Sequence, residues 1–291
     1  MRSDLCVFIL SHGRPDSMLT HDLLRSQGYT GEIFVVIDDE DETGPRYHER
    51  FGSNVLVFSK TEMSSTVDTM ENRPNHRGVV YARNACWRLA KEVGFRYFMT
   101  FDDDCNTLGM RINEKGHYGW WPVRDLDSLF DSMIQYFETI PALSIALSQG
   151  GDHMGGASGR LGKSNMLLRK AMCSFLCSVD RPFEFPGRTN EDTNMYVSEG
   201  RRGALFFTIG RLQVNSGTTQ KNAGGLTDLY RQFGTYEKSM YSVLISPSSV
   251  TVRPMGRTSM RLHHSVSWDS TAVKIVHERY RKPDSVEKVL R

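Results

Sequence analysis

The sequence is poor in cysteine and has no long apolar run, and each shortage excludes a class of protein. Its five cysteines in 291 residues are odd in number and include no Cys-x-x-Cys pair, so we expect neither a disulfide framework nor a zinc site. They are more typical of core residues in a reducing compartment. No apolar run approaches the roughly 20 residues of a membrane span, and an apparent strand follows Met1 directly. We therefore expect a cytosolic protein without a signal peptide or a membrane segment.

Two further absences concern nucleic acids and nucleotides. The net charge is only +2, so contact with a polyanion would need a local basic patch. No Gly-x-Gly-x-x-Gly motif follows the first apolar run, which disfavours a Rossmann dehydrogenase. The segment ASGRLGKS at 157–164 resembles a phosphate-binding loop, but Ala157 replaces the first glycine and no strand precedes it. Because such a loop holds phosphate only between a strand and a helix, we do not expect one here.

Apolar runs alternate with helical patterns through the first third of the chain. The runs are LCVFIL, EIFVVID, NVLVFSK and RYFMTF, and apolar stripes at helical spacing occupy roughly 16–28 and 78–95, ending at Gly28 and Gly94. Strands that alternate with helices predict an α/β fold in which helices flank a mostly parallel central sheet on both faces.

Polar clusters follow three of these runs, at residues 11–14, 38–41 and 102–104. Because ligands bind at the carboxyl ends of the strands in such sheets, we expect the clusters to converge. The last cluster is three adjacent aspartates, which repel one another unless cations, hydrogen-bond donors or water surround them. A solvated loop is one interpretation, and a site for a hard divalent cation is the other.

The order of these motifs carries a resemblance to a known class. SHGRP, VVIDDED, YARNACWRLA and FMTFDDD resemble, in sequence, the nucleotide-binding parts of GT-A glycosyltransferases. FEFPGRTNEDTNMYV, TTQKNAGGLTDLYRQFGTYEKSMYSVLISPSSVTV and RLHHSVSWDSTAVKI resemble the TET/JBP-associated glycosyltransferase family, over about residues 5 to 282. This family includes phage enzymes that glycosylate hydroxymethylated pyrimidines in DNA.

The resemblance implies an organisation, a reaction and a place. It implies one GT-A domain over 1–291, with a nucleotide-sugar half at 1–108 and an acceptor half at 109–291 whose C-terminal segment returns to the metal. The donor would be a UDP-sugar (glucose, galactose or N-acetylglucosamine), the metal Mn²⁺ or Mg²⁺, and the acceptor 5-hydroxymethylcytosine in DNA. The protein would act in the host cytoplasm if it is encoded by a phage. Alternatives are a protein Ser/Thr or glycan acceptor, and a non-catalytic binding module.

The resemblance also implies roles for acidic and histidine residues. Asp192 would be the base that takes the acceptor proton, and Glu191 would orient it. The other interpretation of NEDTN is a helix N-cap. A base facing the anomeric carbon would invert the configuration, by analogy with glycosidases. The metal ligands would be Asp102, Asp104 and one of two histidines, His263 and His264. The alternative interpretation is that these histidines lie in the core or on the surface and bind no metal.

The remaining implied residues bind the donor and the DNA. The donor contacts would be Ser11, His12, Arg14, Asp38, Asp39, Arg83, Asp102, Asp103, Gly150, Gly151 and Lys274. The glycine-rich segment 148–159 has no strand or helix pattern and would let the backbone approach the sugar closely. Cations and aromatics suit a DNA backbone and an extruded base, and the residues implied are Trp120, Trp121, Lys221, Arg253 and Arg257. Scattered surface charge and core tryptophans are the alternative.

Overall fold

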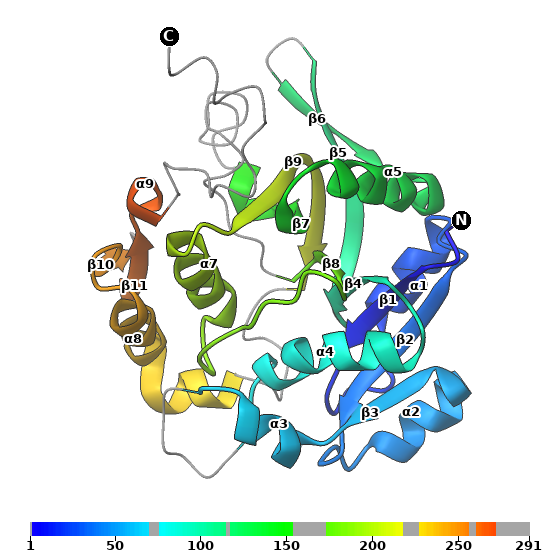
Figure 1. Ribbon diagram of the computed structural model, residues 1–291, viewed down its shortest axis with the longest axis horizontal. Helices are drawn as coiled ribbons and strands as arrows, with labels where there is room; N and C mark the ends of the chain where they lie inside the picture. Colours follow the sequence, from blue (N-terminus) through cyan, green and yellow to red (C-terminus); the bar gives the residue numbers. More distant parts are fainter. Residues whose placement is uncertain are drawn as a thin grey trace, which may run out of the picture.

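A nine-stranded mixed sheet forms the centre of the computed structural model, which describes residues 2–69, 76–114, 117–153, 173–217, 227–255 and 260–271 (Figure 1). Its strands are β1 (Leu5–Leu10), β2 (Glu32–Asp38), β3 (Val55–Phe58), β4 (Tyr97–Asp102), β5 (Cys105–Glu114), β6 (His117–Pro122), β7 (Ala142–Gln149), β8 (Phe175–Ser178) and β9 (Leu205–Ser216). Their order across the sheet is β3-β2-β1-β4-β8-β7-β9-β5-β6. All run in one direction except β5 and β8. The predicted α/β fold class is thereby confirmed.

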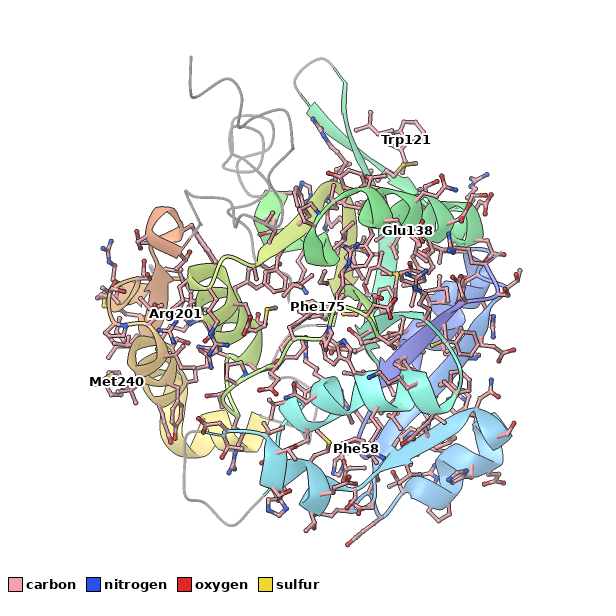
Figure 2. All side chains as sticks on the ribbon, viewed as in Figure 1. Phe58, Trp121, Glu138, Phe175, Arg201 and Met240 are labelled. Atoms are coloured by element: carbon pink, nitrogen blue, oxygen red, sulfur yellow. The ribbon has the colours of Figure 1, made fainter. Side chains whose placement is uncertain are left out.

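Helices cover both faces of this sheet. On one face lie α1 (Leu19–Ser26), α2 (Gly44–Phe51) and α5 (Leu126–Thr139), and on the other lie α3 (Lys60–Thr66), α4 (Val80–Glu92) and α7 (Glu191–Arg201). The six residues of β1 are all buried because alternate side chains enter the two apolar clusters. Phe175 belongs to the cluster on the α4 side, in the interior of the protein (Figure 2).

The C-terminal part adds a small layer outside α7. It consists of α8 (Thr227–Ile245), β10 (Val250–Met255), β11 (Arg261–Val266) and α9 (Trp268–Thr271). The two strands form an antiparallel ribbon that packs on α8, and α8 packs on α7. Two short 3-10 turns, η1 (Gly52–Asn54) and η2 (Gly150–His153), complete the elements that bear on the site.

Local sequence signals explain where the first helices end and begin. Gly28, with φ of +83°, follows α1, and a Cβ atom there would lie 2.8 Å from the Arg124 carbonyl oxygen. Only glycine fits this left-handed position and this close approach. Asp125 caps α5, because its carboxylate accepts the Ser128 backbone N–H at 3.0 Å. The predicted helices at 16–28 and 78–95 are thus confirmed, each slightly shorter than its apolar stripe.

The connection between β4 and β5 determines where the acidic turn lies in the sheet. Strands β4 and β5 follow each other directly in the chain, joined at Asp103 and Asp104, yet β8, β7 and β9 lie between them in the sheet. Strand β9 accommodates this with an irregular register, in which Leu147 pairs with Ile209 but Ser148 pairs with Gln213. The acidic turn therefore lies where the two halves of the sheet meet.

Two expectations from composition can be compared with the structure. All five cysteines are buried free thiols, as expected for core residues. None of the helices in the described parts of the chain is both long enough and apolar enough to cross a membrane.

Candidate functional site

The carboxyl edge of the first four strands brings the predicted clusters together around Asp103. Its carboxylate accepts the Ser11 hydroxyl at 2.6 Å and lies 3.2 Å from a guanidinium nitrogen of Arg14. The Tyr47 hydroxyl lies 2.6 Å from Ser11 Oγ and accepts the Arg14 backbone N–H at 2.9 Å. Burial raises the pKa of Asp103, while Arg14 and Ser11 oppose the rise. Asp103 is 1% exposed, so its part is to fix the first loop against the acidic turn.

A second group surrounds Asp38 at the end of β2. Its two carboxylate oxygens lie 2.7 Å from His12 Nδ1 and 2.9 Å from Lys60 Nζ. The hydrogen bond with Asp38 raises the pKa of His12, although burial lowers it. The pKa of Asp38 is lowered in turn, because these two partners outweigh its burial. Asp39 accepts the Lys60 backbone N–H at 2.8 Å, so the end of β2 and the start of α3 form one polar wall beside the first loop.

The third group joins the acidic turn to the start of α7 through one buried arginine. Arg83, on α4, lies 3.6 Å from a carboxylate oxygen of Asp102 and 3.3 Å from one of Glu191. Its guanidinium lies over the rings of Phe175 and Phe185, at 5.1 and 5.5 Å from their centroids. Although burial lowers the pKa of Arg83, Glu191 and Asp102 raise it above its ordinary value. The cation is therefore permanent and holds both acids in one site.

Asp102 itself is poised between its two protonation states. Its pKa is raised to about 7, chiefly by burial and also by Asp104 and Asp103, while Arg83 opposes the rise. A carboxylate that is unfavourable in the free protein and 38% exposed gains stability from an added cation. Asp104 lies beside it at the start of β5, and its carbonyl oxygen accepts the Gly217 N–H at 3.1 Å.

These acids fit a hard divalent cation. Asp102 and Asp104 offer carboxylate oxygens, and such ions complete their coordination with water and substrate phosphates rather than with an all-protein cage. No cluster of three or more His, Cys, Asp or Glu side chains suited to a metal occurs in the described ranges. The assignment of these two aspartates to a metal stays a prediction.

Thr20, at the start of α1, fixes the shape of the acidic turn. Its hydroxyl donates to the Asp102 carbonyl at 2.5 Å and accepts the Cys105 N–H at 2.9 Å, and its own backbone N–H donates to the Asp103 carbonyl at 3.1 Å. The side chain is fully buried. One residue thus binds three successive parts of the turn that carries the aspartates.

The start of α7 holds the predicted acid pair. Glu191 and Asp192 are its first residues, both are buried, and Asp192 also raises the pKa of Arg83. The preceding Asn190 is in the N-cap position with φ of +56°, but its side chain makes no capping hydrogen bond. It donates instead to the Lys238 carbonyl at 2.9 Å and to Ser242 Oγ at 3.1 Å. The N-cap interpretation of NEDTN therefore explains the position of Asn190 but not the acid pair, whose catalytic role stays a prediction.

The two histidines lie on β11 behind the start of α7. His264 is buried, with Nδ1 at 3.0 Å from Asn190 Nδ2 and Nε2 at 3.5 Å from Thr193 Oγ1. Neighbouring strand residues usually point to opposite faces, yet the rings of His263 and His264 lie 4.1 Å apart. His264 thus supports the helix that carries the acid pair, and metal ligation by either histidine stays a prediction.

The predicted DNA contacts are spread over several elements. Trp120 and Trp121 leave opposite faces of the β5–β6 hairpin, and Trp121, 49% exposed, lies at the outer edge (Figure 2). The core-tryptophan alternative therefore does not hold for Trp121. Arg253 is exposed on β10. Lys221, Arg257 and Lys274 lie outside the described residues, as does the 157–164 segment. Gly150 and Gly151 begin η2, so the glycine-rich segment starts as the end of β7 and a 3-10 turn.

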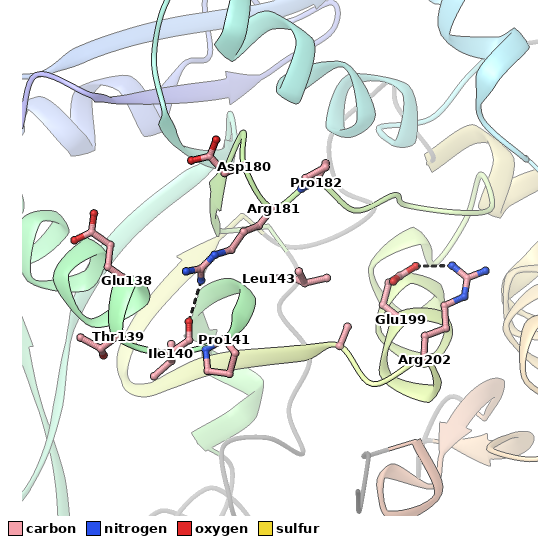
Figure 3. A pocket seen from close by; sticks show the side chains of 11 residues that line it. Glu138, Thr139, Ile140, Pro141, Leu143, Asp180, Arg181, Pro182, Glu199 and Arg202 are labelled. Carbon is pink, nitrogen blue, oxygen red and sulfur yellow. Dashed lines mark hydrogen bonds and ion pairs between the residues drawn. The ribbon is translucent and has the colours of Figure 1, made fainter. Parts of the chain in front are cut away.

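A hollow of about 770 Å³ lies at the opposite edge of the sheet from these acids (Figure 3). It is lined by the end of α5, the starts of β7 and β9, and the end of α7. Arg181 in this hollow already donates to the carbonyls of Phe137, Ile140 and Ala142 at 2.9–3.1 Å. Its guanidinium is thereby committed to holding the chain, and the hollow carries none of the predicted site residues.

Three polar residues of the site were not predicted from the sequence, namely Tyr47, Lys60 and Thr20. Lys60 is the last residue of the predicted strand run NVLVFSK, and that position was the one available signal. Thr20 lies within the predicted helix at 16–28, and Tyr47 lies where no element was predicted. Nothing in either segment separates a site residue from a surface or core residue.

An α/β sheet with this acidic carboxyl edge is the architecture of the GT-A glycosyltransferases, the class of nucleotide-sugar-dependent enzymes that the motifs resemble. The model of one family, TET-Associated Glycosyltransferase, matches residues 5–225. The chain belongs to this family and is a glycosyltransferase, which confirms the resemblance found in the sequence. No match is found among curated proteins.

Solved structures similar to the chain are glycosyltransferases of low sequence identity. One is glucosyl-3-phosphoglycerate synthase from Mycobacterium tuberculosis in complex with Mn²⁺, UDP and phosphoglyceric acid, with a TM-score of 0.44 and 17% identity over 99% of this chain and 91% of that one. Another is the mannosyltransferase PcManGT from Pyrobaculum calidifontis in complex with GDP-Man and Mn²⁺, with a TM-score of 0.46 and 12% identity over 84% and 65% of the two chains. A third is S. aureus TarS 1–349, with a TM-score of 0.44 and 12% identity over 83% and 65%.

Proposed function

We propose that the protein transfers a sugar from a UDP-sugar to the hydroxymethyl oxygen of 5-hydroxymethylcytosine in DNA, with Mn²⁺ or Mg²⁺ bound by Asp102 and Asp104. The observation that carries the proposal is the buried Arg83, which pairs with Asp102 on one side and Glu191 on the other. Two acidic groups from distant parts of the chain thereby belong to one site, as transfer from a sugar diphosphate to a hydroxyl requires. Membership of the TET-Associated Glycosyltransferase family supports DNA as the acceptor.

The edge of the sheet supplies the parts that hold the donor. His12, Asp38 and Lys60 form the polar wall at the end of β2, and they are the groups proposed to receive the nucleoside of the donor. Arg14 carries the positive charge beside the acidic turn and is proposed to face the diphosphate. When bound, the divalent cation neutralises the charge that develops on the diphosphate leaving group.

Asp192 serves as the base of the transfer in this proposal. Its carboxylate takes the proton from the acceptor hydroxyl, the hydroxyl oxygen bonds to the anomeric carbon, and the bond from that carbon to the diphosphate oxygen breaks with its electron pair leaving on UDP. A single displacement of this kind inverts the anomeric configuration. Glu191 is held by Arg83 and keeps the start of α7 in place.

The proposal is tested with the full chain, Mn²⁺ and an equimolar mixture of UDP-glucose, UDP-galactose and UDP-N-acetylglucosamine. Hydroxymethylcytosine DNA and hydroxymethyluracil DNA are supplied separately, and the nucleosides are analysed by mass spectrometry. We expect a sugar adduct on hydroxymethylcytosine that disappears in Asp104→Asn and Asp192→Asn. Asp131→Asn, a half-exposed aspartate on α5, is the matched control and should retain the adduct.

Two other results would change the proposal in different ways. Metal-dependent release of UDP without an adduct on either DNA would reject the DNA acceptor and direct the search to protein Ser/Thr residues or glycans. An adduct on hydroxymethyluracil DNA alone would keep DNA as the acceptor and replace the base.

A further inference from the structure

A row of polar side chains crosses the sheet from the acidic turn towards the β5–β6 hairpin. Leu108, Leu212 and Val214 enter the apolar cluster beneath α5. Because side chains alternate along a strand, their neighbours Thr107, Gln213 and Asn215 leave the other face of the sheet, which is the face of α4 and α7. The row therefore shares its face with Arg83 and the acid pair.

These polar side chains form one directed chain of hydrogen bonds. Arg111 Nε donates to Gln213 Oε1 at 2.6 Å, Gln213 Nε2 donates to Asn215 Oδ1 at 2.5 Å, and Asn215 Nδ2 donates to Thr107 Oγ1 at 2.8 Å. A guanidinium can only donate, so the direction of every later bond is fixed. The Thr107 oxygen is an acceptor within the chain, which leaves its O–H as the donor at the end nearest the acidic turn.

The other end of the chain is held rigidly. The Arg111 guanidinium lies over the ring of Trp120, at 5.0 Å from its centroid. The Trp120 ring in turn lies against the backbone of Gly109, where an added Cβ atom would come within 2.6 Å of Trp120 Cζ2. A cation fixed on an aromatic ring keeps one orientation. The hydrogen bonds from Arg111 then orient the side-chain amides of Gln213 and Asn215.

The donor end of the chain, the Thr107 hydroxyl, lies on the strand that follows the acidic turn. Thr107 is three residues beyond Asp104 on β5, a separation of roughly 10 Å at the usual rise of a strand. Asn215 is two residues before Gly217, whose N–H donates to the Asp104 carbonyl. Thr107 is exposed while Gln213 is 1% exposed, so the chain passes through the interior of the protein and ends at its surface near the acidic turn.

We infer that this chain is the recognition element for the acceptor, with the Thr107 O–H donating to an unprotonated oxygen or nitrogen of the acceptor pyrimidine. The inference rests on the proposed function, because it takes a nucleotide as the acceptor. A pyrimidine edge carries such atoms at fixed positions, and the Thr107 O–H is left to donate to one of them because Asn215 already donates to the Thr107 oxygen. Trp120 acts as a positioning residue for Arg111.

The test compares Thr107→Val and Thr107→Ser in steady-state transfer to hydroxymethylcytosine DNA. We expect Thr107→Val to raise KM for DNA about tenfold, the value of one lost hydrogen bond to a ligand, with kcat changed much less. Thr107→Ser keeps the hydroxyl and should restore KM. Ile112→Thr, an exposed position on the opposite face of β5, is the matched control, and calorimetry should show the same Kd for UDP in all four proteins.

The outcomes separate the inference from the function on which it rests. If the wild-type protein glycosylates DNA and Thr107→Val has the KM of wild type, the inference is overturned and the function stands. Equal rises in KM for Thr107→Val and Thr107→Ser would likewise overturn it, since shape and not the donor would then matter. If the wild-type protein leaves DNA unmodified, the proposed function fails and the pyrimidine assignment fails with it.

Discussion

Arg83 connects the acidic turn to the acid pair at the start of α7. It is 3% exposed and pairs with Asp102 and Glu191. We expect Arg83→Met to lower the free energy of unfolding by about 3–5 kcal/mol, because it leaves the buried carboxylate of Glu191 and the partly exposed carboxylate of Asp102 without a cation. Chemical denaturation measures this change, and sugar transfer should be lost with it.

Arg88 on the same helix provides the control for that prediction. Its salt bridge with Glu92 is on the surface, with the Arg88 side chain 40% exposed. Such pairs contribute about 0–1 kcal/mol, so Arg88→Met should leave both stability and transfer close to wild type. Equal stability losses in the two variants would contradict the role given to Arg83.

The pKa of His12 measures its interaction with Asp38 in the polar wall at the end of β2. Its pKa is raised by the hydrogen bond with Asp38, so the stability from this pair is fully present below about pH 6.5 and is lost as pH rises through the raised pKa. NMR titration should give a His12 pKa above 6.5 in the wild type. In Asp38→Asn we expect a lower pKa, because burial and Lys60 both lower it. An unchanged titration in that variant would show that Asp38 is not the cause.

At the scale of single residues, the sequence predicts acids well and their partners poorly. Asp38, Asp102 and Asp103 follow apolar runs directly, and a sheet edge then brings them together. Tyr47 bonds to Ser11 across 36 positions, and Thr20 bonds to Asp102 across 82. No local pattern encodes such a pairing, because it exists only once the strands are aligned.

At the scale of elements, α1 acts as a brace for the β4–β5 turn through Thr20. Thr20→Val is nearly isosteric and removes the two side-chain hydrogen bonds to Asp102 and Cys105. We expect it to lower the affinity for Mn²⁺ about tenfold and the free energy of unfolding by about 1–3 kcal/mol. Titration of Mn²⁺ followed by electron paramagnetic resonance measures the affinity directly.

Two further variants decide whether the hydroxyl or the fold is responsible. Thr20→Ser keeps the hydroxyl and should bind Mn²⁺ as the wild type does. Thr30→Val removes a hydroxyl that donates to Asp127 far from the turn and should leave the affinity unchanged. Weak Mn²⁺ binding by Thr20→Ser would mean that the methyl group, and not the hydrogen bonds, shapes the turn.

Elements of the first third of the chain follow from the sequence more readily than those of the rest. The strands and helices up to β4 alternate in a regular way, with glycine at helix ends. The segment 148–159 had no recognisable pattern, yet it starts with the end of β7 and a 3-10 turn. Strand β8 has only four residues and pairs antiparallel with both neighbours, so neither its length nor its direction could be anticipated.

At the scale of the whole molecule, a divalent cation should stabilise the fold. The raised pKa of Asp102 shows that its charge is unfavourable in the free protein. A ligand at one hundred times its Kd stabilises by about 2.7 kcal/mol, so saturating Mn²⁺ should raise the Tm by several degrees. Differential scanning calorimetry with and without Mn²⁺ measures this, with Asp131→Asn as the control.

Asp104→Asn should remove most of that increase while leaving the metal-free Tm near wild type. A Tm that rises equally in Asp104→Asn would place the cation elsewhere on the protein.

The place of Asp104 in the sheet could not be judged from the sequence. Which strands lie beside β5 depends on the register of β9, and the irregularity of that register has no local sequence signature.

The link between β4 and β5 also determines how the strands are spaced around the acidic turn. At the acidic turn the strands are joined through Asp103 and Asp104 alone, whereas three strands separate them across the sheet, or roughly 19 Å at the usual strand spacing. The two strands therefore lie close together at the aspartates and belong to separate parts of the sheet away from them. Under the proposed function, duplex DNA that contacts the strands away from this turn would leave in place the carboxylates proposed to face the diphosphate.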